Sequence, residues 1–133
     1  MSTLTALLAF SAWYIFLSFI LVVFRFYAIS QNPKLKIFDQ DGKDVPGFGF
    51  RLTRARNNCY ENLPLFAAVV LVAAHTNSLE MTDKLAMYVF LARVVQSLVH
   101  MISISTPMVM LRATMLVVQY TIIAYWILQL IRL

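Results

Sequence analysis

Four long runs of apolar residues, separated by shorter polar stretches, set the pattern of this chain. The runs extend over about residues 4–29, 58–75, 83–102 and 107–131. About 20 apolar residues in a helix cross the hydrocarbon core of a bilayer, so each run predicts a membrane-spanning helix. The stretch of about residues 30–50 holds three glycines and two prolines and predicts a loop. The pattern therefore predicts an all-α integral membrane protein, with one four-helix domain over residues 1–133.

Several local signals refine these elements. Pro64 lies inside the second apolar run and predicts a kink there, which neighbouring helices accommodate in a membrane. Thr82 and Asp83 offer an N-cap for the third helix, and Pro107 suits the first turn of the fourth. In the loop, lysines alternate with apolar residues over residues 34–38, which suggests a short extended piece.

A polar stripe marks the entry to the second helix. Arg51, Arg54, Asn58 and Glu61 fall at positions i, i+3, i+7 and i+10, which share one helical face. The stripe has cations at its outer end and a carboxylate at membrane depth. Such a face is costly against lipid and needs a partner.

The later helices carry the groups that could supply this partner. Arg93, Gln96 and His100 share one face of the third helix, and Arg112 lies in the fourth. One interpretation is that Glu61 pairs with Arg93 and simply holds the second and third helices together.

The balance of charges favours another interpretation, in which the site binds an external anion. Arg54, Arg56, Arg93 and Arg112 stand against a single membrane-depth glutamate. Because planar guanidinium groups suit carboxylates, this surplus indicates a carboxylate ligand.

Composition narrows the class of protein. Only 13% of the residues are charged and 61% are hydrophobic, whereas a soluble domain has roughly 25% charged residues. The net charge of +5 indicates a membrane surface or an anionic ligand. We expect no nucleic-acid partner, because the basic residues lack an aromatic-interleaved platform. His75 and His100 lack metal-ligand spacing, so no metal site is predicted and both are interpreted as structural polar residues. Cys59 is interpreted as a packing residue.

The distribution of basic residues predicts the orientation. With four spans, the first and third loops share one side of the membrane, where Lys34, Lys36, Lys43, Arg51, Arg54 and Arg56 gather. The opposite side holds only Lys84 and Arg132. The positive-inside rule then places the first loop in the cytoplasm and both termini on the other side.

The sequence Arg54-Ala-x-x-Asn58-x-x-Glu61-x-x-Pro64-x-Phe66 resembles the signature of the MAPEG family, the membrane-associated proteins in eicosanoid and glutathione metabolism. The four spans, the long first loop and the single arginine of the third span extend the resemblance over essentially the whole chain. It implies a homotrimer that binds glutathione in a cytoplasm-facing cleft between adjacent subunits.

The resemblance also implies roles for particular residues. Arg54, Asn58 and Glu61 match the family's glutathione contacts on the second helix, and Arg93 matches its third-helix arginine. Arg51, on the same face as the first three, completes the predicted glutathione-binding set.

The chain also departs from the eicosanoid-forming members of the family. Gln96 and His100 stand where several of those members have His or Tyr. After Pro107, four residues intervene before Arg112, and the catalytic Ser of those synthases has no clear counterpart. These departures favour a small bacterial glutathione-dependent member, and hence a bacterial inner membrane over the endoplasmic reticulum.

The predicted function is that of a membrane glutathione transferase or peroxidase acting on lipophilic electrophiles or hydroperoxides. By analogy with the family, Arg112 would stabilise the glutathione thiolate, with Arg93 as the alternative. A second hypothesis is a non-catalytic membrane protein, similar to the five-lipoxygenase-activating protein, that binds a membrane lipid or docks a partner protein.

Overall fold

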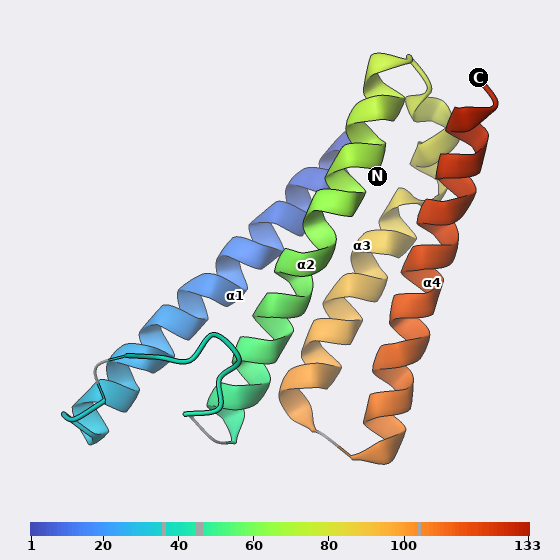
Figure 1. Ribbon diagram of the computed structural model, residues 1–133. Helices are drawn as coiled ribbons and strands as arrows, with labels where there is room; N and C mark the ends of the chain where they lie inside the picture. Colours follow the sequence, from blue (N-terminus) through green and yellow to red (C-terminus); the bar gives the residue numbers. More distant parts are fainter. Residues whose placement is uncertain (36, 45–46, 104) are drawn as a thin grey trace.

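The computed structural model describes residues 1–35, 37–44, 47–103 and 105–133, and these form a bundle of antiparallel helices (Figure 1). The helices are α1 (Thr3–Gln31), α2 (Phe48–His75), α3 (Leu79–Ile102) and α4 (Thr106–Ile131). Helix α3 contacts each of the other three, whereas α1 and α4 lie on opposite flanks. The chain termini and the α2–α3 turn point to one end, and the α1–α2 loop and the α3–α4 turn to the other.

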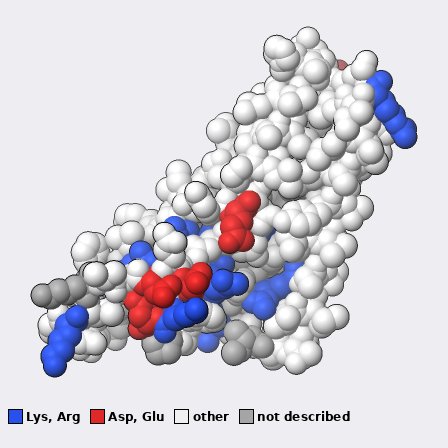
Figure 2. Space-filling model, in the orientation of Figure 1, with Lys and Arg blue, Asp and Glu red and all other residues white. Residues whose placement is uncertain are grey.

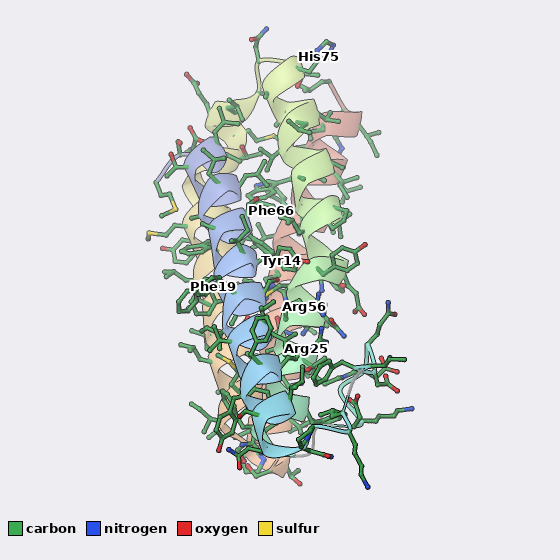
Figure 3. The ribbon with its side chains drawn as sticks, turned by 90° about the vertical axis from the view of Figure 1, so that its left-hand side faces the viewer. Tyr14, Phe19, Arg25, Arg56, Phe66 and His75 are labelled. Atoms are coloured by element: carbon green, nitrogen blue, oxygen red, sulfur yellow. The ribbon has the colours of Figure 1, made fainter. Side chains whose placement is uncertain are left out.

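Aromatic side chains and small residues build the core. The Phe66 ring of α2 lies 5.5 Å from the Phe10 ring of α1 and 6.2 Å from the Trp126 ring of α4, measured between centroids. Figure 3 shows Phe66 on α2 between Arg56 toward the loop end and His75 at the opposite end. Each such aromatic pair contributes about 0.5–1.5 kcal/mol beyond the area that it buries. Buried alanines let the helix backbones approach closely, as in other membrane bundles; they are Ala6, Ala55, Ala73, Ala86 and Ala92.

Three of the described helices, α1, α3 and α4, are long and apolar enough to cross a membrane. Helix α2 is not among them, because Asn58, Glu61 and Asn62 interrupt its apolar sequence. The all-helical fold is thus confirmed, while the fourth span stays a prediction. Helix α2 continues through Pro64 without ending there.

The start of α3 differs from the prediction. The helix begins at Leu79, so the expected N-cap at Thr82 and Asp83 is wrong. These two residues instead serve the N-terminus of α1. Asp83 Oδ1 accepts hydrogen bonds from Thr3 N at 2.7 Å and Thr3 Oγ1 at 2.5 Å, and the hydroxyls of Thr3 and Thr82 lie 2.6 Å apart. A carboxylate is stabilising at this place because the first N–H groups of a helix lack intrahelical partners.

The α1–α2 loop packs against α2. Gly42 has φ of +77°, and a Cβ atom added there would lie 2.9 Å from Thr53 Cβ, so glycine permits the close approach. The Arg25 guanidinium stacks over the Phe38 ring, 5.1 Å from its centroid, and ties the loop to α1. The loop is shorter than predicted, because α2 begins at Phe48. The expected extended piece over residues 34–38 includes residue 36, which lies outside the described residues.

Candidate functional site

A polar pocket of about 160 Å³ lies between α2 and α3, near the loop end of the bundle. Arg54, Asn57, Asn58 and Glu61 of α2 line one side of it, and His100 of α3 lines the other. Asn57 and Asn58 each lie three or four positions from both Arg54 and Glu61, which places the four α2 residues on one helical face. The fold therefore brings together three of the predicted ligand-binding residues, Arg54, Asn58 and Glu61.

A second pocket, of about 210 Å³, adjoins the polar pocket and shares Asn58 and His100 with it. Arg112 of α4 and Gln96 of α3 contribute its other polar groups. The rest of its lining is apolar and comes from one side of α4: Val109, Ala113 and Leu116. The two pockets thus share Asn58 and His100, and their combined lining is polar at the α2 side and mostly apolar at α4.

The charges of this site suit an anionic or zwitterionic ligand. Arg54 in the polar pocket and Arg112 in the apolar one are fixed cations, while Glu61 supplies one carboxylate. The Glu61 side chain is exposed, on a helix that the sequence predicts to enter the membrane. Because a lipid-facing carboxylate is costly, Glu61 needs a bound cationic group or a neighbouring subunit.

The α1–α2 loop folds over the outer edge of the polar pocket. The Asp41 carboxylate lies 3.9 Å from the Arg54 guanidinium, and Asn57 Nδ2 donates a 2.7 Å hydrogen bond to Gln40 O. Between loop and helix lies a further polar pocket of about 300 Å³; its lining residues are Gln40, Asp41, Arg56, Asn57, Tyr60 and Glu61. Figure 2 shows the resulting concentration of both signs of charge at the loop end, on a face that is otherwise mostly uncharged.

Arg51 lies away from these pockets. Its Nε donates a 2.8 Å hydrogen bond to the carbonyl oxygen of Met101, near the C-terminus of α3. The last carbonyl groups of a helix lack intrahelical partners and attract cations, so this contact ties the start of α2 to the end of α3. Arg51 shares the predicted helical face, but its side chain is engaged by another helix.

Arg93 is also separated from the pockets, because it is buried in the core with 1% of its surface exposed. Its guanidinium lies over the Phe10 ring, 5.4 Å from the centroid. Among the described residues, Arg93 Nε and Nη1 have no hydrogen-bond partner, and the pairing with Glu61, which was the alternative interpretation, does not form. Cys59 is fully buried beside it, with its sulfur 3.3 Å from Ser97 Oγ, in line with a packing role.

Comparison with known proteins identifies the family of this chain. The sequence profile of the MAPEG family matches residues 3–132, nearly the whole chain. The chain belongs to the MAPEG family. Comparison with curated proteins and with solved structures finds no match. Membership of the MAPEG family, together with three apolar helices, indicates a membrane protein with a glutathione- or eicosanoid-related role.

The structure adds residues to this MAPEG site that the sequence interpretation missed. His100 was interpreted as a structural polar residue, yet it lies where the two pockets meet. The sequence did offer one signal for a site role of His100, because His100 shares a face of the third helix with Gln96. Asn57 was not singled out, because its role depends on the fold of the loop. Within the described parts of the chain, no cluster of three metal-ligating side chains occurs.

Proposed function

We propose that this MAPEG protein is a membrane-embedded glutathione transferase or peroxidase acting on lipophilic electrophiles or hydroperoxides. One observation carries the proposal: a polar pocket lined by Arg54, Asn58 and Glu61 adjoins an apolar pocket that contains Arg112. The first offers counter-charges for the ends of a zwitterionic peptide. The second offers a cation beside apolar surface, where a thiol and a lipophilic molecule can meet.

The sizes of the pockets support a shared ligand. Each of the two adjoining pockets is smaller than the roughly 300–1,000 Å³ typical of small-molecule sites. We therefore place the tripeptide across both. In the proposed arrangement, a carboxylate of glutathione binds Arg54, its ammonium group approaches Glu61, and its sulfur lies toward Arg112. Arg51 and Arg93 remain outside this contact set, because neither lines the pockets.

The proposed chemistry depends on the fixed charge of Arg112. An opposite charge within about 4–6 Å lowers the pKa of a thiol by 1–3 units, which raises the thiolate fraction at neutral pH. With an electrophile, the thiol proton passes to solvent, the sulfur bonds to the electrophilic carbon, and the leaving group departs with its electron pair. With a hydroperoxide, two glutathione molecules supply two electrons, giving an alcohol, water and glutathione disulfide.

The setting of the site suggests how the protein is assembled and oriented. The exposed Glu61 is not covered within one bundle, which supports a site between neighbouring subunits, and the MAPEG resemblance implies that these form a homotrimer. The basic residues at the loop end favour a cytoplasmic loop, in a bacterial inner membrane, where soluble glutathione reaches the polar pocket. Lipophilic substrate would reach the apolar pocket from the bilayer.

Turnover tests this proposal directly. Detergent-purified protein is mixed with glutathione and either a chlorodinitrobenzene or an organic hydroperoxide, and product is measured. We expect turnover by the wild type and its loss in Arg112→Leu, while Arg132→Leu, which removes a charge at the opposite end, stays active. Glutathione binding without turnover of any such substrate would favour the non-catalytic alternative, and absence of binding would contradict both glutathione roles.

A further inference from the structure

A chain of side-chain hydrogen bonds leads from α4 into the candidate site. The Tyr120 hydroxyl donates to Asn62 Oδ1 at 2.5 Å, which joins α4 to α2. Asn62 Nδ2 in turn donates hydrogen bonds to two atoms of Asn58, which lies one turn earlier on α2: the backbone oxygen at 2.7 Å and Oδ1 at 2.9 Å. Asn62 is buried, whereas Asn58 lines both adjoining pockets. This series of hydrogen bonds therefore ends at Asn58, which both pockets share.

Elementary chemistry fixes the orientation of both amides. A backbone carbonyl only accepts hydrogen bonds, so the Asn62 atom facing Asn58 O must be its NH₂ group. The Asn62 oxygen then faces Tyr120 and accepts from its hydroxyl. The same NH₂ group faces the Asn58 side chain, which must present its oxygen there. Asn58 Nδ2 is left as the polar atom available to a ligand, with no protein acceptor among the described residues.

We propose that Tyr120 and Asn62 are positioning residues, which hold the Asn58 amide so that it presents its NH₂ group to the site. The junction of the pockets then selects a hydrogen-bond acceptor, namely a carbonyl or carboxylate oxygen of the ligand. This inference rests on the proposed function, since it assigns that oxygen to glutathione. Without these hydrogen bonds, the Asn58 amide turns freely and offers its oxygen as readily as its NH₂ group.

A purely structural role for Tyr120 is the competing explanation. A tyrosine hydroxyl within a membrane bundle needs a partner, and interhelical hydrogen bonds of this kind stabilise helix packing. Both explanations predict some loss of stability on removal of the hydroxyl. Only the positioning role predicts that the effect on glutathione affinity depends on Asn58.

The test is a double-mutant cycle on glutathione binding, measured by calorimetry on detergent-purified full-length protein. Tyr120→Phe keeps the ring and removes the hydroxyl. It should weaken binding roughly 3- to 10-fold, the value of one ordinary hydrogen bond. In an Asn58→Ala background, the same substitution should have no further effect on affinity, because the amide that it orients is gone. Tyr125→Phe is the matched control, since this α4 tyrosine is similarly exposed and should bind as the wild type does.

Each outcome bears on the inference. Equal weakening in both backgrounds, or unchanged affinity in Tyr120→Phe alongside a lower thermal midpoint, would show a purely structural tyrosine and overturn it. If Tyr120→Phe does not fold, Asn62→Ser takes its place in the cycle with the same expectation. A wild type that binds no glutathione would overturn the proposed function and this inference together. Glutathione binding that is insensitive to Tyr120 would overturn the inference alone.

Discussion

Asp41 of the α1–α2 loop lies 3.9 Å from Arg54 of α2, and both side chains are about half exposed. Arg54 also lines the polar pocket, where a ligand carboxylate is proposed to bind. The loop carboxylate therefore occupies one side of the cation that the ligand needs. Because exposed ion pairs contribute little to stability, Asp41 competes with the ligand without holding the loop firmly.

Asp41→Asn should strengthen glutathione binding about two- to five-fold, because it removes this competing carboxylate and the pair itself is weak. Calorimetry on the detergent-purified protein measures the change. Glu80→Gln is the matched control, since it removes one exposed carboxylate at the opposite end of the bundle. Weaker binding in Asp41→Asn would instead identify Asp41 as a contact for the ligand's ammonium group.

Glu61→Gln should weaken glutathione binding by at least about 30-fold. The substitution keeps the size of the side chain but removes the charge proposed to hold the ammonium group. In the proposed trimer a neighbouring subunit covers Glu61, and losing one partner of a buried, charge-assisted contact costs about 2–5 kcal/mol. Affinity that stays unchanged in a correctly assembled variant would show that Glu61 only joins subunits.

Arg51→Met should lower stability more than affinity. It keeps the apolar stem but leaves the Met101 carbonyl at the end of α3 without the Arg51 donor. Hydrogen bonds to charged groups contribute about 1.5–3 kcal/mol, so thermal unfolding in detergent should shift to lower temperature. The reverse pattern, with normal unfolding and lost glutathione binding, would return Arg51 to the ligand-binding set.

Assembly is tested by mass measurement in native detergent micelles. The exposed Glu61, on a helix predicted to enter the membrane, predicts a neighbouring subunit, and the MAPEG resemblance specifies three. We expect the mass of a trimer. A monomer alone would remove both the intersubunit site and the cover proposed for Glu61.

The sequence correctly predicted four helices, because membrane helices have long apolar runs that are visible in the sequence. The helix ends were harder to predict, as the α3 N-terminus shows. Thr82 and Asp83 have the composition of a cap, but they contact Thr3 at the start of α1, where Asp83 accepts the backbone N–H of Thr3. A local signal does not specify which helix end a side chain serves.

The candidate site was predicted in part for a related reason. Helical periodicity places Arg54, Asn58 and Glu61 on one face, and the fold indeed gathers them in one pocket. Periodicity places Arg51 on the same face, yet a carbonyl of α3 engages it. The links through Asn62 and Tyr120 join residues 58 positions apart, so they depend on the packing of α4 against α2.

The central claim is that the site binds glutathione with its thiol beside Arg112, and titration of the bound thiol tests it most directly. The thiolate absorbance near the ultraviolet edge is followed against pH, with saturating glutathione, for wild type, Arg112→Leu and the distant control Arg132→Leu. We predict that the pKa of the bound thiol in wild type and control lies 1–3 units below the solution value of about 8.5, and returns toward it in Arg112→Leu. Equal lowering in all three proteins would assign the role to another cation. A wild-type thiol that titrates as it does in water would contradict the claim.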